Sequence, residues 1–161
     1  MLKQILYGNI TGIEHIGSTA IPNIVAKPVI DIALAVKNLN HIQKIIKKLT
    51  TGGYIYRDEQ GISDRHLFVK ITEDNRTHHI HLMPISHVQW VIHLLFRDYL
   101  IAHPGIAKDY EKLKLALKEQ YHHDRTEYTK RKSNFIVKVI ELSKKENKQV
   151  DQLKHLKNEK C

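Results

Sequence analysis

The strongest constraint on this chain is one almost continuous apolar segment, residues 29–36, with the sequence VIDIALAV. It follows Pro28, and an apolar run of this length is typical of a strand buried on both faces. One acidic residue, Asp31, interrupts it. A carboxylate among so many apolar side chains is costly unless it is hydrogen-bonded, paired or bound to a cation. Asp31 is therefore either a structural residue bonded to a neighbour such as Lys27, or part of a functional site.

The segments around this strand predict a domain in which strands come first and helices follow. Residues 12–16 have the pattern of a short strand that leads into a turn at Gly17, and residues 42–49 that of an amphipathic helix. Three further strands, arranged as a meander, are expected at residues 54–57, 65–71 and 78–83. This order predicts an α+β fold: a mixed β-sheet flanked by helices, with a helical C-terminal third.

The helical part is predicted to begin at Ser86, which forms a capping-box pattern with Gln89. The apolar face of that first helix is predicted at Val88, Val91, Ile92, Leu95 and Tyr99. Two more helices are expected, one with Pro104 in its first turn and one capped by Asp124. The periodicity then decays, so we expect one domain over residues 1–146 and a charged, frayed tail over residues 147–161.

The charge of the chain bears on its partners. Of 161 residues, 26 are Lys or Arg and 17 are Asp or Glu, which gives a net charge of +9. Residues 1–100 hold 11 basic and 8 acidic side chains, and residues 101–161 hold 15 and 9. Most of the excess is thus mixed with acids along the C-terminal helices. We expect solvated helical faces there and rank RNA or DNA lowest among the partners.

The sequence also carries expectations about the compartment. The only cysteine is Cys161, so no internal disulfide can form. The N-terminal residues lack the apolar region of a signal peptide, and no apolar run approaches the roughly 18 residues that span a bilayer. We expect a cytoplasmic protein without a membrane partner.

Two short motifs have residue types that suit chemistry beside Asp31. A Gly17-Ser18 turn offers free backbone N–H groups and a hydroxyl to a phosphate, although Gly-Ser-Thr is also a common turn. His79 and His81 are two residues apart, so on a strand they share one face at a spacing of roughly 7 Å. Two such imidazoles can bind one metal ion or one phosphate, or simply bond to backbone and solvent. Glu14 either faces the same side as Asp31 or is exposed.

Three basic residues, Arg65, Arg97 and Lys132, are candidate phosphate ligands, because cationic side chains bind phosphate oxygens strongly. On helices such residues are more often surface ion pairs. No Walker loop, CxxC pair, GxGxxG or HExxH motif occurs. Their absence argues against a P-loop kinase, a zinc ribbon, a Rossmann-type dinucleotide enzyme and a zincin-type protease.

Two long motifs resemble the GrpB family. The first joins residues 13–22, IEHIGSTAIP, to residues 26–32, AKPVIDI, and the second joins residues 95–100, LFRDYL, to residues 102–104, AHP. The spacing of the two histidines and the stretch 128–135 with its lysine are also similar, so the resemblance covers roughly residues 9–143. The family usually carries a longer segment before its first strand, so this chain is expected to begin later than its relatives.

The resemblance implies a nucleotidyltransferase-like fold. In that superfamily a Gly-Ser turn binds the nucleotide triphosphate, and carboxylates on neighbouring strands hold two Mg²⁺ ions. Gly17 and Ser18 match the phosphate turn, and Asp31 matches the first carboxylate. The position of the second carboxylate is Ala33, which cannot bind a cation, and Glu14 is the residue that would replace it. A set of Asp and His ligands suits Mn²⁺ or Zn²⁺ better than a pair of Mg²⁺ ions.

The expected function is binding of a nucleotide or another phosphorylated small molecule, with a divalent metal and, if the protein is an enzyme, nucleotidyl transfer. The first alternative is a catalytically degenerate ligand-binding or regulatory module, because Ala33 replaces a carboxylate, and the second is a basic RNA-binding protein. The candidate catalytic residues are Asp31 and Ser18. The candidate phosphate ligands are Gly17, Ser18, Thr19, Lys27, Arg65, Arg97 and Lys132. The candidate metal ligands, for Mg²⁺, Mn²⁺ or Zn²⁺, are Asp31, His79, His81 and Glu14.

Overall fold

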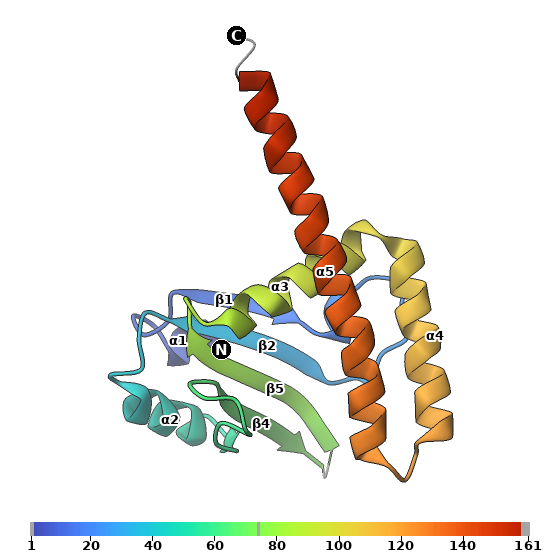
Figure 1. The fold of residues 1–161 in the computed structure, drawn as a ribbon. Coiled ribbons are helices and arrows are strands. Elements are labelled where there is room, and N and C mark those ends of the chain that lie inside the picture. The colour runs from blue at the N-terminus through green and yellow to red at the C-terminus, as the bar shows by residue number, and fades with distance from the viewer. Residues whose placement is uncertain (1, 74, 159–161) are drawn as a thin grey trace. The chain divides into compact units, whose positions relative to one another are not determined.

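The first part of the chain is built on a five-stranded mixed sheet (Figure 1). The computed structural model describes residues 2–73 and 75–158, which form two compact units that divide between Leu94 and Leu95. The strands, all in the first unit, are β1 (Gly12–Ile16), β2 (Ile30–Val36), β3 (Ile55–Tyr56), β4 (His66–Thr72) and β5 (Asn75–Pro84). Their order across the sheet is β1-β2-β5-β4-β3.

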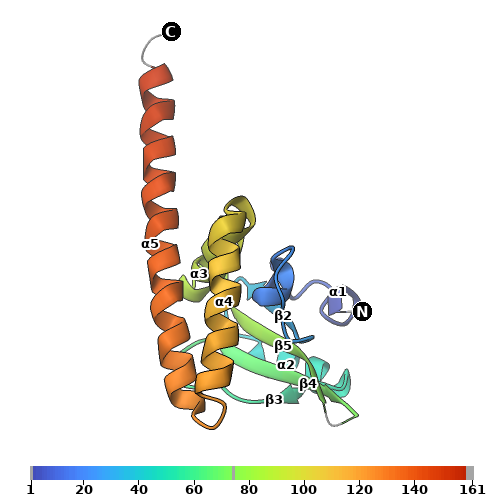
Figure 2. The ribbon, with the colours of Figure 1, turned by 90° about the vertical axis from the view of Figure 1, so that its right-hand side faces the viewer.

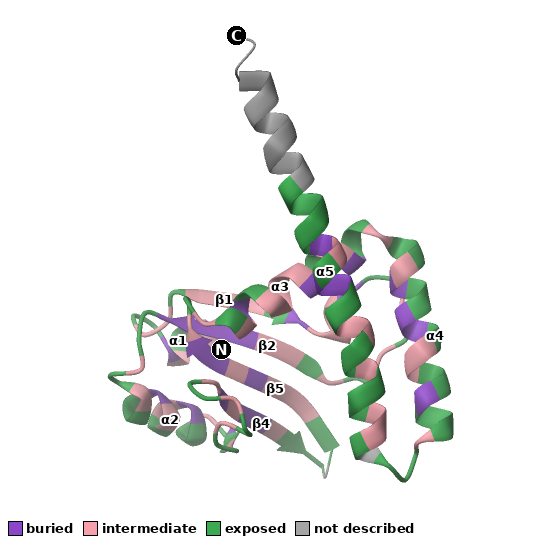
Figure 3. Ribbon diagram, viewed as in Figure 1, coloured by how far each residue is buried: buried purple, intermediate pink, exposed green. Residues whose placement is uncertain are grey.

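The apolar segment forms β2, which has a neighbour on each side. It pairs antiparallel with β1 and parallel with β5. Residues 33–36 are at most 1% exposed, and Figure 3 shows buried residues along the second half of β2 and beside them on β5. The expectation of a strand buried on both faces is therefore confirmed. The meander is also confirmed, since β3, β4 and β5 pair antiparallel in chain order.

The two faces of the sheet carry different residues, because side chains alternate along each strand. One face packs Leu34, Phe68 and Ile80 in a single cluster with the α2 residues Ile45 and Leu49. The helices of this part are α1 (Leu2–Ile5) and α2 (Ile42–Thr51), with a 3-10 turn over Ser18–Ala20.

The opposite face, which we call the Trp90 face, is lined by small residues. Ala33 and Ala35 pack there against Trp90 together with Ile16 and Met83. Gly12 belongs to the same row, and a Cβ atom on it would lie 2.9 Å from the Trp90 ring. The absence of large side chains at these strand positions makes room for the indole.

Trp90 belongs to α3 (Val88–Ala102), and two sequence-based predictions about this helix were wrong. It begins two residues after Ser86, and its first turn is capped by His87, whose Nδ1 accepts the Gln89 N–H at 3.1 Å. Val88 and Val91, predicted on the buried face, are 62% and 48% exposed, whereas Trp90 is only 9% exposed. The helix is apolar nearly all round, so its periodicity could not choose a face, and the bulk of the indole decided it.

The second unit contains the end of α3 with α4 (Pro104–Gln120) and α5 (Arg125–Asn158). These last two helices lie side by side (Figure 2). The Tyr110 ring packs between Phe96 and Phe135, at centroid distances of 5.2 and 5.4 Å. Asp124 accepts the Glu127 N–H at 2.9 Å and so caps α5 as predicted.

The α+β class, the mixed sheet and the helical C-terminal part are thereby confirmed. The domain boundary at residue 146 stays a prediction, since α5 continues to Asn158, and residues 159–161 with Cys161 lie outside the described residues. Of the helices in the described residues, none combines the length and the apolar character needed to cross a membrane.

The packing predicts a large difference between two isoleucines on the same face of the sheet. Ile80 is fully buried and Ile30 is 39% exposed. We expect Ile80→Ala to lower the free energy of unfolding by about 2–5 kcal/mol, because it leaves a cavity in the core. Ile30→Ala, also in a strand, should cost well under half of that. Urea unfolding followed by circular dichroism measures both, and equal losses would contradict the assigned core.

Candidate functional site

The candidate residues on β2 and β5 meet because these strands are parallel neighbours. Asp31 pairs with His79 and Ala33 pairs with His81. On the other side of β2, Ile16 pairs with Asp31. Paired residues share a face of the sheet, so Asp31 and both histidines lie on the Trp90 face. The spacing in the sequence predicted that the two imidazoles share one face of a strand. The parallel pairing of β2 with β5 places Asp31 next to them.

Asp31 is bonded to histidine rather than to Lys27. Its Oδ1 lies 2.9 Å from Nδ1 of His79 and 3.8 Å from Nε2 of His81. An ionised carboxylate can only accept, so His79 donates from Nδ1, and in the neutral form of the ring the lone pair is on Nε2. Lys27 is exposed in the segment before β2.

The charge state of Asp31 follows from two opposing effects. Burial alone would raise its pKa, but the hydrogen bonds and positive charge of His79 and His81 hold the pKa of this carboxyl well below its ordinary value. The carboxylate is therefore ionised across the whole physiological pH range. Such a group is a weak base, better suited to orienting an imidazole or binding a cation than to taking a proton.

The Gly17 turn packs directly against this carboxylate. Gly17 has φ 71° and ψ −170°, a conformation that is essentially restricted to glycine. A Cβ atom there would lie 2.9 Å from the Asp31 Cβ and would also collide with its Oδ2. The turn that was expected to hold phosphate thus lies beside Asp31.

The side chain of Thr19 anchors the turn. Its hydroxyl donates to the Val29 carbonyl at 3.2 Å and lies 3.0 Å from Nε2 of His15. These contacts tie the 3-10 turn to the residue that precedes β2. Ser18 opens the same turn.

Glu14 occupies a position that the sequence left open. It pairs with Ala33 in the antiparallel β1–β2 ladder, and Ala33 in turn pairs with His81 on β5. Glu14 therefore lies on the same face of the sheet as Asp31. The residue beside it on β2 is Ala33, whose side chain is only a methyl group. This is the register in which it could replace the missing second carboxylate.

His93 on α3 is a site residue that sequence reasoning missed. Its ring centroid lies 5.3 Å from that of His81. Burial, together with the positive charges of His81 and Arg65, lowers the pKa of His93 to about 4. The sequence contained a signal for it: His93 is three residues after Trp90, so the two side chains lie on one side of the helix. The prediction assigned a different face of α3 to the interior.

Two of the candidate cations belong to the second compact unit. Arg97 donates from Nε to Asp98 at 2.7 Å. Lys132 lies over the Tyr128 ring, 5.9 Å from its centroid. In the first unit, Arg65 precedes β4 and donates to the Glu59 carbonyl at 3.1 Å.

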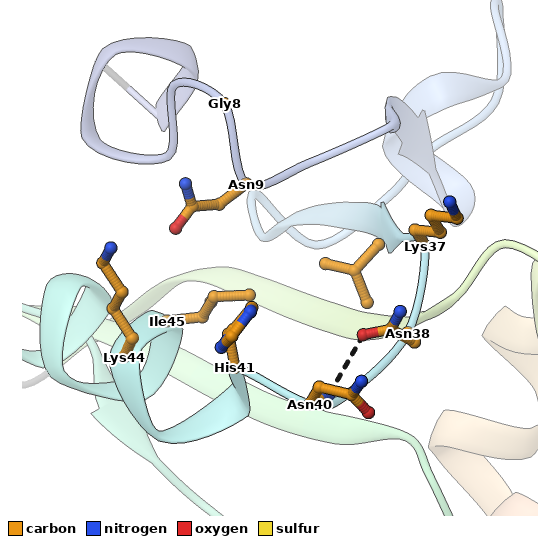
Figure 4. A pocket seen from close by; sticks show the side chains of 9 residues that line it. Gly8, Asn9, Lys37, Asn38, Asn40, His41, Lys44 and Ile45 are labelled. Carbon is orange, nitrogen blue, oxygen red and sulfur yellow. Dashed lines mark hydrogen bonds between the residues drawn. The ribbon is translucent and has the colours of Figure 1, made fainter.

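A hollow of about 400 Å³ lies elsewhere in the first unit (Figure 4). It is lined mostly by polar side chains from the segment before β1, the end of β2 and the start of α2, among them Asn9, Lys37, His41 and Lys44. Val36 on its wall is five residues beyond Asp31, which is roughly 17 Å along a strand. The hollow is therefore separate from the Asp31 cluster.

The donor set around Asp31 does not form a complete protein cage for a metal. Among the residues that the structure describes, no group of three or more His, Cys, Asp or Glu side chains is placed to hold a metal ion. Mg²⁺ is commonly bound by one or two carboxylates plus substrate phosphates, an arrangement that needs no such cage. Asp31 and Glu14 are carboxylates on the same face of the sheet, the type of donor that this arrangement uses.

Comparison with known proteins gives consistent matches. The family model described as GrpB protein matches residues 1–142. The UPF0157 protein YqkA of Bacillus subtilis is 38% identical over 144 residues, 89% of this chain and 42% of that protein. The glutamate-rich protein GrpB of Alkalihalophilus pseudofirmus is 35% identical over 144 residues, 87% of this chain and 83% of that protein.

A solved structure matches as well. The crystal structure of conserved protein GrpB from Enterococcus faecalis superposes with a TM-score of 0.81 at 36% identity, and covers 91% of this chain and 87% of that one. The chain thus spans less than half the length of YqkA but most of the length of the two GrpB proteins.

The close approach of Gly17 to Asp31 predicts the effect of adding one methyl group. Gly17→Ala should lower the free energy of unfolding by about 1–3 kcal/mol for backbone strain, with a further loss because Asp31 must move. Gly8→Ala is the matched control, because Gly8 also has φ 71° but no atom within 4 Å of the added Cβ. Chemical denaturation measures both, and an equal loss in the two variants would show that Asp31 does not press on the turn.

The lowered pKa of His93 predicts a pH-dependent stability. In the unfolded chain the His93 ring has its ordinary pKa of 6.5, and in the folded protein its pKa is about 4. Stability should therefore be complete above pH 6.5 and fall towards pH 4, by at most about 1.4 kcal/mol per pH unit from this residue. His93→Phe should flatten this part of the profile when urea unfolding is compared at pH 7 and pH 5. A variant that loses as much stability as the wild type between these values would contradict the assignment.

Proposed function

The chain belongs to the GrpB family, and from this premise we propose that its first unit binds a nucleotide or another phosphorylated small molecule together with Mg²⁺ or Mn²⁺. One observation carries the proposal: the Gly17 turn packs against an ionised Asp31 that His79 holds in place. A Gly-Ser turn supplies backbone N–H donors for phosphate oxygens, and the carboxylate supplies an oxygen for the accompanying cation.

The metal in this proposal enters with the phosphates. Asp31 would provide one protein ligand, and Glu14, which pairs with Ala33 on the same face, would provide a second. When bound, the ion would neutralise phosphate charge. His79 and His81 then act on Asp31: they keep the carboxylate ionised and fix its orientation in the site.

The same residues suit nucleotidyl transfer. In that reaction an acceptor hydroxyl attacks the α-phosphorus, the bond to the leaving diphosphate breaks, and the hydroxyl proton passes to a base. Asp31 is too weak a base for this step, because its pKa is held far down. We assign the proton to Nε2 of the neutral form of His79, in which Nδ1 donates to Asp31 and Nε2 carries the lone pair. Asp31 is then the residue that orients the base.

Ala33 supports a second form of the proposal, in which the site binds its ligand without turning it over. A carboxylate at that position would sit directly between Glu14 and His81, and its absence removes one cation ligand. Release of diphosphate from a bound nucleoside triphosphate separates the two forms. A transferase releases it in proportion to acceptor, whereas a binding module is stabilised against heat by the nucleotide and releases none.

Calorimetric titration tests the binding itself. The full chain is titrated with ATP, GTP, CTP and UTP, each with Mg²⁺ or Mn²⁺. We expect at least one pair to bind, and Asp31→Asn and His79→Gln to weaken that binding about tenfold or more, the effect of losing one charged hydrogen bond. His78→Gln is the matched control, because His78 lies on the same strand with its side chain on the opposite face. The proposal fails if no nucleotide binds the wild type, or if all three variants bind like it.

A further inference from the structure

Among the described residues of the first unit, three buried side-chain nitrogen atoms have no hydrogen-bond partner. They are Nε of Arg65, Nδ1 of His81 and Nε2 of His93. Each comes from a different segment, namely the loop before β4, strand β5 and helix α3. Proteins pair nearly all of their buried polar atoms, so an unpaired one calls for an explanation. Three of them in one region call for a common explanation.

The three side chains converge on the Trp90 face. The rings of His81 and His93 lie 5.3 Å apart at an interplanar angle of 43°. Arg65 is two residues before Leu67, which pairs with His81 across the β4–β5 ladder. Arg65 directly precedes the β4 residues that pair with the end of β5 where His81 lies. The charge of Arg65 also reaches His93, where it helps to lower the pKa.

The chemistry of these atoms selects the kind of group they would bind. Nε of arginine can only donate, and the guanidinium stays charged at all relevant pH values. Within the described part of the chain, Arg65 has a carbonyl partner at Glu59 but no carboxylate partner. A half-buried cation without an acid favours an anion, and a donor requires an oxygen acceptor.

The two imidazoles can complete the same site. His93 can donate from Nε2 as a neutral ring. His81 has its Nε2 side towards Asp31, 3.8 Å from Oδ1, and its unpaired Nδ1 on the other side. Its Nδ1 therefore lies on the side away from Asp31, where it is a potential donor to a bound anion. One anion within reach of these three atoms would give each of them a partner.

We propose that Arg65, His81 and His93 form an oxyanion pocket that binds one phosphate group of the ligand. The inference rests on the proposed function in one respect, that the ligand carries phosphate. It adds a binding residue, His93, and assigns to His81 a bridging position between Asp31 and the phosphate. Ordinary water is the competing occupant.

Nuclear magnetic resonance of the ¹⁵N-labelled full chain tests the pocket, first with inorganic phosphate and then with ATP and Mg²⁺. We expect phosphate to shift the signals of the Arg65 Nε–H and of both imidazoles. Arg65→Gln and His93→Phe should each weaken phosphate binding about ten- to hundredfold, as expected for one charged hydrogen bond. Arg57→Gln is the control, since Arg57 is an exposed arginine of the same unit, and it should bind like the wild type.

The outcomes separate this inference from the proposed function. If ATP binds the wild type but Arg65→Gln and His93→Phe bind it and phosphate unchanged, the pocket is wrong and the proposed function stands. If phosphate moves the three signals while no nucleotide binds, the pocket stands and nucleotide binding is wrong. If neither ligand moves any of the three signals, the atoms are satisfied by water and the pocket is overturned.

Discussion

The hydrogen bond between Asp31 and His79 connects the sheet to the chemistry of the site. It joins two strands that are 48 residues apart in sequence and parallel in space. Without the imidazole, an ionised carboxylate would be placed among apolar neighbours at considerable cost. With it, the carboxylate remains charged and has a fixed position. Gly17 depends on the same contact, because only a residue without a Cβ fits against Asp31 at that turn.

The features that local sequence could predict were those that depend on near neighbours along the chain. The apolar run fixed β2 as an interior strand, and the spacing of His79 and His81 placed them on one face. The parallel pairing of β2 with β5 was not readable from either strand, because it is a contact between distant segments. The partner of Asp31 was for that reason left open between Lys27 and other groups.

His93 shows a different limit of sequence reasoning. It lies on a helix whose residues are apolar on nearly every side, so the hydrophobic pattern gave no unique buried face. The large Trp90 side chain packs over Ala33, Ala35 and Gly12, and this choice turns His93 towards His81. The small residues on β2 leave room for one large side chain, and Trp90 is the only tryptophan in the sequence. This complementarity identifies the buried face of α3. The small side chains and the indole are complementary parts of one packing solution.

The central claim is that a phosphorylated ligand binds on the Trp90 face beside Asp31, and a crystal structure tests it most directly. Crystals of the full chain would be grown with Mn²⁺ and a non-hydrolysable nucleoside triphosphate, and the ion located by its anomalous scattering. The account predicts Mn²⁺ within coordination distance of an Asp31 oxygen and phosphate density against the Gly17 turn. Nucleotide bound instead in the hollow lined by Lys37 and Lys44, with the Asp31–His79 pair untouched, would contradict it.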